Sequence, residues 1–290
     1  MAQSSPKTVG EVLNAAADYL AGKKVDEPRL AAEYLASRLL NCRRLELPLK
    51  FQQALTEKQL EALRRGTKRV ADGEPLQYVL GQWDFMGHTF KVDRRALIPR
   101  PETEGLVEQV LKCEALWSRE KPAIADVGTG TGCVVISLAL ARPNGLYLAV
   151  DVSDDALELA GENAAGLGIA DKIAFANDEL CNLIEPSSLD AIVANLPYVS
   201  TSDYEQLPAH IRKHEPRLAL DGGPTGLAVI ETVVQDASMG LKPDGMLFLE
   251  IGDAQADAVS KILAGAGFDS VAVIPDLAGR DRVMSARLTA

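Results

Sequence analysis

Apolar and polar residues follow one periodicity at the start of the chain and another in the rest of it. Over about the first 80 residues, apolar positions recur every three to four residues, as in amphipathic helices. Thr8 and Thr56 are each followed three positions later by Glu or Gln, the pattern of a capping box, and Asp26 with Pro28 marks another helix start. We therefore expect a small all-helical domain over residues 1–75.

Residues 76–98 change to an alternation of apolar and polar positions that is interrupted by Gly81 and Gly87. Such alternation with glycine breaks is typical of a β-hairpin, so we expect a hairpin that links two domains. The segment 99–101 is a stiff elbow, because each of its two prolines fixes its own φ and restricts the residue before it. A helix is predicted from about Glu102 to Trp117.

Strands and helices alternate over residues 99–290. Short apolar runs predict seven strands, at residues 123–127, 146–150, 173–177, 189–194, 245–251, 270–274 and 282–288. Helices fit at residues 133–141, 153–167, 224–240 and 253–265. The loop 275–281 is too short for the crossover that parallel pairing needs, so the last strand should be antiparallel. The pattern predicts an α/β fold with a mostly parallel sheet.

A glycine-rich turn connects the first of these strands to the helix that follows it. The turn reads Asp126-Val127-Gly128-Thr129-Gly130-Thr131-Gly132. Glycines let a backbone approach a ligand closely and adopt positive φ. Cys133 stands where a dinucleotide fingerprint requires its third glycine, and no Gly-Lys-Ser/Thr of a P-loop follows. A nucleotide-binding turn of another kind is indicated, and a tight turn without a ligand is the alternative.

Acidic residues at the ends of the next strands indicate which nucleoside could bind there. Asp151 ends the second strand, where an acid can accept hydrogen bonds from both ribose hydroxyls. No basic residue occupies the glycine loop, which disfavours a phosphate and favours S-adenosylmethionine, a cationic nucleoside without phosphates. Asp178 could accept a hydrogen bond from the adenine amine, or it could be a solvated turn acid. Asp151 could instead cap a helix, in competition with Ser153.

The tetrapeptide Asn195-Leu196-Pro197-Tyr198 follows the fourth apolar strand. Ligands of open α/β sheets bind just beyond the carboxyl ends of such strands. The Asn195 side-chain oxygen and the Leu196 carbonyl are two acceptors beside the aromatic face of Tyr198. They could hold a planar –NH2 group, either a carboxamide or an exocyclic base amine. The alternative is an ordinary Asn-Pro turn.

Composition and charge narrow the function classes. Of the 290 residues, 47% are hydrophobic, which excludes general disorder, and no apolar run reaches membrane-spanning length. Scattered cysteines and the absence of a signal-peptide pattern predict a reducing, cytoplasmic location. The formal net charge of −11 argues against a direct nucleic-acid partner. His210, His214 and Glu215 lack a clear further ligand, so we expect no metal site.

The glycine loop, Asp151 and the Asn195 tetrapeptide together resemble amino-directed methyltransferases, whose Class I fold is Rossmann-like. Other segments are similar, more narrowly, to the release factor glutamine methyltransferases. These segments are Gln77-Tyr78-Val79-Leu80-Gly81 with Phe85 and Gly87, Leu97-Ile98-Pro99-Arg100-Pro101-Glu102-Thr103-Glu104, Glu215-Pro216-Arg217-Leu218-Ala219-Leu220 and Asp276-Leu277-Ala278-Gly279-Arg280-Asp281-Arg282. The resemblance covers nearly the whole chain and is loosest over the helical first domain.

The resemblance implies a Class I methyltransferase domain over residues 99–290 that follows a hairpin linker, residues 76–98. It implies that S-adenosylmethionine is the cofactor and that a set of loop and strand-end residues binds it. That set is Asp126, Gly128, Thr129, Gly130, Thr131, Gly132, Asp151, Asp178, Glu179 and Asn195. The tetrapeptide 195–198 would be the catalytic box, holding the glutamine of the Gly-Gly-Gln loop of peptide chain release factors. The N-terminal helices would help a monomeric enzyme to bind the release factor.

Two positions depart from the family pattern. Leu196 replaces the first proline of Asn-Pro-Pro-Tyr, although its main-chain carbonyl supplies the same acceptor. Glu179 stands where the family often has a large aromatic residue, so stacking on adenine is not expected there. The ribosomal RNA adenine dimethylases share Asn-Leu-Pro-Tyr and are the main alternative, although they lack the segment 97–104. A ribosomal-protein glutamine methyltransferase and a cofactor-sensing scaffold without catalysis are further alternatives.

Overall fold

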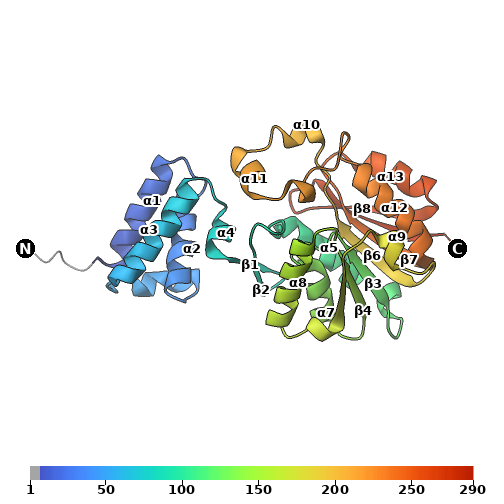
Figure 1. Cartoon of the computed structure of the whole chain (residues 1–290), viewed down its shortest axis with the longest axis horizontal. Coiled ribbons are helices and arrows are strands. Elements are labelled where there is room, and N and C mark those ends of the chain that lie inside the picture. The colour runs from blue at the N-terminus through green and yellow to red at the C-terminus, as the bar shows by residue number, and fades with distance from the viewer. Residues whose placement is uncertain (1–6, 290) are drawn as a thin grey trace, which may run out of the picture. The chain divides into compact units, whose positions relative to one another are not determined.

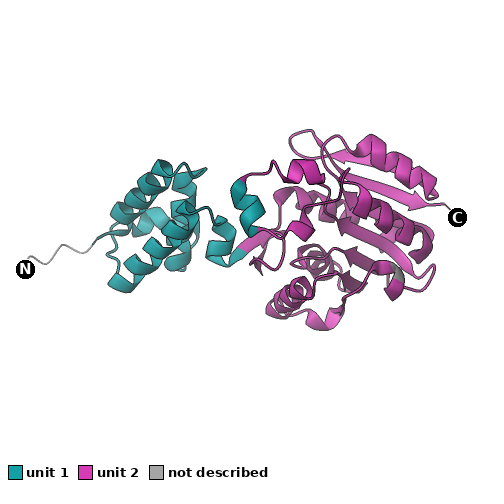
Figure 2. Cartoon of the chain, turned by 45° about the horizontal axis from the view of Figure 1, so that its top comes forward, with its two compact units in different colours: residues 1–82, 209–214 teal, residues 83–208, 215–290 magenta. Residues whose placement is uncertain are grey.

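The computed structural model describes residues 7–289, apart from the side chain of Cys181. The chain forms two compact units, which Figure 2 shows in different colours. One contains the residues up to 82 together with 209–214, and the other contains residues 83–208 and 215–290. The division of the first 98 residues into a helical domain and a linker at position 75 stays a prediction.

Unit 1 is helical, as its periodicity predicts (Figure 1). Its elements are α1 (Val9–Gly22), α2 (Pro28–Leu39), the 3-10 helix η1 (Arg44–Lys50), α3 (Glu57–Ala71), α4 (Leu76–Leu80) and α11 (Ala209–His214). Both predicted capping boxes are confirmed, at Thr8 and at Thr56. The N-cap of α2 is Glu27 in the left-handed conformation (φ 46°). Asp26, which we expected to mark the start of this helix, precedes the N-cap by one residue. Pro28 occupies the first helical position, where its missing N–H has no cost.

A two-stranded hairpin opens unit 2, made of β1 (Gln82–Phe85) and β2 (His88–Lys91). Met86 and Gly87 between them both have positive φ, 50° and 76°, as a tight two-residue hairpin turn requires. The rings of Phe85 and Phe90 meet edge to face with centroids 6.1 Å apart, and both rings are buried in the core of the α/β unit. The hairpin is thereby fixed to this unit.

The main sheet has seven strands in the order β5-β4-β3-β6-β7-β9-β8. They are β3 (Ala123–Val127), β4 (Leu146–Val150), β5 (Ile173–Ala176), β6 (Leu189–Asn195), β7 (Leu241–Glu250), β8 (Phe268–Pro275) and β9 (Asp281–Leu288). Strands β3 to β7 pair in parallel, whereas β9 is antiparallel to both β7 and β8. The predicted Class I methyltransferase fold, with its antiparallel last strand, is confirmed.

Helices cover both faces of this sheet (Figure 1). They are α5 (Pro101–Lys112), α6 (Glu114–Trp117), α7 (Cys133–Ala141), α8 (Asp154–Gly166), α9 (Leu180–Leu183), α12 (Ala228–Gly240) and α13 (Ala256–Gly265). Helix α10 (Thr201–Tyr204) and the 3-10 turns at Ala170–Lys172 and Arg217–Ala219 belong to the connections between elements. Helices α5, α7 and α8 pack on the face that contains Val193 and Phe248. Helices α9, α12 and α13 pack on the opposite face, with Ile192 and Leu247. Alternate residues of each strand are thus buried on opposite sides, which explains the continuous apolar runs.

Three predicted elements differ from the structure. The predicted helix 102–117 is interrupted at Cys113, where ψ is 88°, and the Trp117 indole N–H donates to the Val110 carbonyl at 2.8 Å. The predicted helix 224–240 begins only at Ala228, and the predicted helix 253–265 begins at Ala256. In the latter two cases the preceding residues form loops that follow the carboxyl ends of β6 and β7, the edge of the sheet at which the candidate site lies.

Candidate active site

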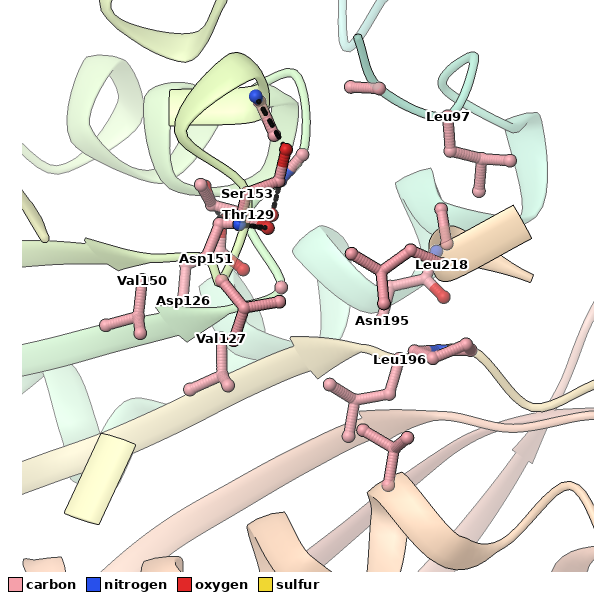
Figure 3. A pocket seen from close by; sticks show the side chains of 18 of the residues that line it. Leu97, Asp126, Val127, Thr129, Val150, Asp151, Ser153, Asn195, Leu196 and Leu218 are labelled. Carbon is pink, nitrogen blue, oxygen red and sulfur yellow. Dashed lines mark hydrogen bonds between the residues drawn. The ribbon is translucent and has the colours of Figure 1, made fainter. Parts of the chain in front are cut away.

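One cavity of about 470 Å³ collects most of the predicted site residues. It lies where β3, β4 and β6 end, as expected for an open α/β sheet. Eleven of the predicted residues line it, namely Asp126, Gly128, Thr129, Gly130, Thr131, Asp151, Asp178, Glu179, Asn195, Leu196 and Pro197. Figure 3 shows Asp151 and Thr129 on one side of the cavity and Asn195 with Leu218 on the other. All of its lining residues belong to unit 2.

The glycine loop connects β3 to α7 through three glycines in the left-handed region, with φ of 72°, 56° and 77° at Gly128, Gly130 and Gly132. Side chains other than glycine rarely adopt these angles. The Gly130 N–H donates to Asp151 Oδ2 at 2.9 Å, which ties the loop to the end of β4. Gly132 does not line the cavity: a Cβ there would lie 2.9 Å from Ile136 Cδ1, so this glycine allows close packing of α7.

Asp126 lies at the base of the loop and is almost completely buried. Its Oδ2 accepts hydrogen bonds from the Thr129 hydroxyl at 2.7 Å and from the Val135 N–H at 3.2 Å. Burial raises the pKa of this carboxyl to about 7, against the lowering effect of both hydrogen bonds, and the negative charge of Asp151 raises it further. Asp126 therefore holds the loop in shape from beneath.

Asp151 is positioned by the backbone on both sides of it. Oδ1 accepts from the Ser153 N–H at 3.0 Å and Oδ2 accepts from Gly130, so each oxygen keeps a lone pair for a ligand. The Ser153 side chain caps α8 by accepting from the Ala156 N–H, so the capping role considered for Asp151 falls to Ser153. Burial raises the pKa of Asp151.

Asp178 and Glu179 line the cavity beyond the end of β5. Asp178 Oδ1 accepts from the Asn182 side-chain amide at 2.9 Å and from the Glu179 N–H at 2.7 Å. These hydrogen bonds lower the pKa of Asp178, which keeps the carboxylate charged. Both of these bonds are local to the turn that Asp178 belongs to, and its second oxygen can accept from a ligand.

Asn195 is the last residue of β6, and the parallel register places it opposite Glu250 of β7. Its side-chain nitrogen Nδ2 donates to the Thr103 hydroxyl of α5 at 3.0 Å. A Cβ on Gly128 would lie 3.4 Å from Leu196 Cδ2 and 3.5 Å from the Asn195 carbonyl oxygen. The glycine loop and the tetrapeptide therefore meet in one cavity, close enough for a Cβ on Gly128 to be in van der Waals contact with the tetrapeptide.

Tyr198 does not line the cavity, so its predicted role as an aromatic wall has no counterpart in this conformation. Its hydroxyl donates to Glu250 Oε1 at 3.3 Å, and burial raises the pKa of Tyr198 to about 12. Its ring packs against the hydrophobic core formed with α12 and α13. The structure therefore directs the Tyr198 side chain to Glu250 and to this core.

A second glycine-containing loop supports the tetrapeptide, and the sequence analysis did not identify it. A Cβ on Gly222 would lie 2.3 Å from the Pro197 carbonyl oxygen, and one on Gly226 would lie 2.3 Å from the Tyr198 carbonyl oxygen. The side chain of Gln255 donates to the same Tyr198 carbonyl at 3.0 Å. The signal available in the sequence was the glycine spacing over 222–226, which has no apolar periodicity of its own.

The charges around the cavity fit a cationic ligand. Its two lining arginines are engaged by acids, Arg95 by Asp93 and Glu162, and Arg100 by Glu215. The remaining charged side chains of the lining are carboxylates, which would attract a sulfonium and repel a phosphate. Among residues 7–289, no cluster of three or more His, Cys, Asp or Glu side chains is arranged to hold a metal ion.

Two family models match the chain. The model described as PrmC N-terminal domain matches residues 11–81, and the model described as Methyltransferase domain matches residues 124–215. The first match covers most of the helical unit and ends just before the hairpin. The second contains the glycine loop, Asp151 and the tetrapeptide.

Curated relatives match over almost their full length. A release factor glutamine methyltransferase of Chlorobaculum tepidum is 37% identical over 96% of this chain and 96% of its own. That of Moorella thermoacetica is 40% identical over 95% and 96%, and that of Rhodopirellula baltica is 35% identical over 98% and 99%.

Solved structures support the fold alone. The catalytic domain of hMettl16, determined in complex with the MAT2A 3′UTR hairpin 6, matches with a TM-score of 0.56. It covers 81% of this chain and 83% of that chain at 14% identity. Within residues 7–289, every helix is too short or too polar to cross a membrane.

Proposed function

We propose a reaction from the premise that this chain belongs to the release factor glutamine methyltransferase family. A methyl group passes from S-adenosylmethionine to the side-chain amide nitrogen of the glutamine in the Gly-Gly-Gln motif of peptide chain release factors. The observation that carries the proposal is the meeting of the glycine loop and the Asn195 tetrapeptide in one cavity. A methyl donor and a planar amide bound to these two elements would touch each other.

The cofactor supplies an electrophilic methyl group on a positively charged sulfur. On the protein side, Asp151 would accept hydrogen bonds from the ribose hydroxyls, and Asp178 would accept from the adenine amine. Backbone N–H groups of the glycine loop and the carboxylates of the lining would surround the rest of the nucleoside. A site that shields the sulfonium from bulk water would favour the loss of its charge in the transition state.

An amide nitrogen is a poor nucleophile because its lone pair is delocalised into the carbonyl. The Asn195 side-chain oxygen and the Leu196 carbonyl would accept hydrogen bonds from the two N–H atoms of the substrate amide. These bonds fix the plane of the amide and turn the nitrogen toward the methyl group. Such positioning can contribute up to about 7–11 kcal/mol to the lowering of a barrier. The methylated amide then releases one proton to solvent.

The relatives favour a protein glutamine over an RNA base as the methyl acceptor. The adenine dimethylase alternative rested on the tetrapeptide and the fold, whereas the curated relatives match helical unit and catalytic unit alike. The net charge of −11 supports a protein substrate without direct nucleic-acid contacts. We propose that the enzyme works as a monomer in the cytoplasm and that unit 1 helps to bind the release factor.

Methylation of a co-purified substrate tests the function directly. The protein is incubated with methyl-labelled S-adenosylmethionine and a release factor, and the product is digested and analysed by mass spectrometry. Methyl incorporation at the Gly-Gly-Gln glutamine is the expected result. Incorporation into a ribosomal protein instead would select that alternative, and saturable cofactor binding without any transfer would select the scaffold.

The Asn195→Ala variant tests the acceptor role. We expect it to lose methylation while it keeps most of its affinity for S-adenosylmethionine, because Asn195 binds the substrate amide. Single-turnover kinetics and titration calorimetry on the same preparation measure the two properties. Wild-type turnover in this variant would show that the acceptor role is wrong.

A further inference from the structure

A chain of hydrogen bonds connects the Asn195 side chain to Thr103, which also lines the cavity, and to Glu250. Asn195 Nδ2 donates to the Thr103 hydroxyl at 3.0 Å, and this hydroxyl donates to Glu250 Oε2 at 2.7 Å. The Tyr198 hydroxyl donates to the other oxygen, Glu250 Oε1, at 3.3 Å. The chain joins α5, β6 and β7, three elements that are far apart in the sequence.

The direction of each bond in this chain is set by the carboxylate at its end. Both oxygens of Glu250 accept in these contacts, Oε2 from Thr103 and Oε1 from Tyr198, so Thr103 uses its single proton on Glu250. The Thr103 oxygen then has only lone pairs to offer to Asn195. Of the two ends of the Asn195 amide, only the NH2 end can bond to it. The carbonyl oxygen Oδ1 is therefore left for the cavity.

We propose that Thr103 and Glu250 are positioning residues that fix the flip state of the Asn195 amide. In this state the side-chain oxygen faces the substrate. The inference rests on the proposed function, since it explains how the acceptor of the substrate amide is kept in place. Glu250 does not line the cavity, and Thr103, which does, has its hydroxyl bonded to Asn195 and Glu250, so both are proposed to act through Asn195.

The flip state matters because the two ends of an Asn side chain have nearly the same shape and opposite hydrogen-bonding character. A flipped Asn195 would present N–H donors to the N–H donors of the substrate amide. The substrate amide would lose one hydrogen-bond acceptor, and its N–H would face the N–H of Asn195 instead. That flip state would therefore not bind the amide productively. The rate is reduced in proportion to the fraction of molecules that hold Asn195 in the wrong flip state. That fraction grows as the hydrogen bond between Asn195 and Thr103 weakens.

Glu250 is suited to define this direction because its own surroundings hold it rigidly. It is 1% exposed and lies on the last residue of β7, next to Asn195 in the parallel register. Alternation along the strands places Asn195 and Glu250 on the sheet face that α5 covers, which is where Thr103 lies. Arg282 of β9 is also buried, and its Nη1 donates to the Ile251 carbonyl at 2.9 Å, so its positive charge lies near the carboxylate.

Two near-isosteric substitutions test the proposal on the full-length protein. Thr103→Val removes the hydroxyl and keeps the shape, and Glu250→Gln replaces the acceptor-only group with one that can also donate. We expect Thr103→Val to lower kcat roughly tenfold, about the effect of one lost hydrogen bond, with the affinity for S-adenosylmethionine unchanged. Thr103→Ser keeps the hydroxyl and should restore kcat to within about threefold of wild type.

The double variant and a spectroscopic signal separate positioning from general support. Because both residues act through one bond to Asn195, Thr103→Val with Glu250→Gln should lose no more activity than the worse single variant. Side-chain amide 15N spectra, assigned with Asn195→Asp, should show one sharp Asn195 pair in the wild type and a broadened or doubled pair in Thr103→Val. Ser137→Ala is the matched control, since it also deletes a buried hydroxyl, which bonds the Cys133 carbonyl.

Several outcomes would overturn the inference. Full kcat in Thr103→Val, equal defects in Thr103→Val and Thr103→Ser, or multiplicative losses in the double variant would each do so while the wild type still methylates glutamine. A wild type that binds S-adenosylmethionine but methylates no glutamine overturns the proposed function, and the inference with it. If Thr103→Val does not fold, the inference is tested by kcat, cofactor affinity and the Asn195 side-chain amide spectrum of Glu250→Gln and Thr103→Ser.

Discussion

Individual acidic residues at the strand ends were the most predictable part of the site. Asp126 and Asp151 follow apolar runs directly, so their place at the carboxyl edge of the sheet follows from the sequence pattern. The sequence could not show how each is held, because their partners come together only on folding: the Thr129 hydroxyl and an N–H of α7 for Asp126, and the Gly130 N–H for Asp151. Thr103 was quoted only as part of a segment, since its partners lie 92 and 147 residues away.

The Asp151→Ala variant tests the ribose assignment at this scale. Loss of a carboxylate that accepts hydrogen bonds from the ligand should weaken S-adenosylmethionine binding by about 1.5–3 kcal/mol, which is roughly 10- to 150-fold. Titration calorimetry measures the change. Asp155→Ala, which removes an exposed carboxylate from the first turn of α8, is the control and should bind as the wild type does. Unchanged affinity in Asp151→Ala would contradict the assignment.

The raised pKa of Asp126 predicts how stability depends on pH. The folded protein holds this proton more tightly than the unfolded chain, because the pKa is about 7 instead of 3.8. This contribution is fully present below pH 3.8 and is lost as the pH rises through about 7, with a total of about 4 kcal/mol at 1.36 kcal/mol per unit. Urea unfolding at several pH values measures it.

Asp126→Asn removes the titration and is the variant for comparison. Its free energy of unfolding should fall less than that of the wild type between pH 4 and pH 8. Asp155→Asn, with its exposed side chain, should follow the wild type across the same range. Parallel curves for Asp126→Asn and the wild type would show that the buried carboxyl does not titrate in this window.

At the scale of elements, long periodic segments were predictable and the loops near the site were not. Every strand of the main sheet falls within a few residues of its prediction, because buried runs bounded by turn residues are a strong local signal. The break at Cys113 follows no proline or glycine; it coincides with a hydrogen bond from the Trp117 side chain back to the Val110 carbonyl of α5. The late start of α12 arises because Gly222 and Gly226 must first pass beneath the tetrapeptide.

The Gly222→Ala variant tests this support. Its Cβ would meet the Pro197 carbonyl oxygen at 2.3 Å, so the loop or the tetrapeptide must move. We expect a loss of about 1–3 kcal/mol of unfolding free energy and a lower kcat at saturating cofactor. Gly161→Ala is the control, because nothing lies within 4 Å of its Cβ and alanine in a helix is favourable by about 0.5–1 kcal/mol. Equal activities in both variants would contradict the support.

At the scale of the whole molecule, the change of periodicity predicted a helical part and an α/β part. The two compact units correspond to these parts, but residues 209–214 belong to the first unit although they lie deep in the second half of the chain. Local sequence patterns cannot show that a segment so late in the chain belongs to the first unit. Each unit has its own buried core, so each can respond to its own perturbations.

Two separable unfolding transitions are the expected consequence. S-adenosylmethionine at about 100 times its Kd adds about 2.7 kcal/mol to the unit that binds it. Since all cavity residues lie in unit 2, the cofactor should raise the Tm of one transition in calorimetry. Thr56→Ala, which removes the cap of α3, should lower the other by about 1 kcal/mol. A single transition that shifts with both changes would contradict independent units.

The pairing of β6 with β7 contains a register shift between Leu189 and Ala191, just before the stretch that aligns Asn195 with Glu250. A slip by one position beyond that shift would turn Asn195 toward the other face of the sheet and away from Thr103. The misaligned protein would retain its helices, most of its buried surface and its nucleoside site. A measurement of catalytic turnover would therefore detect a misaligned strand, whereas spectroscopy of secondary structure would not.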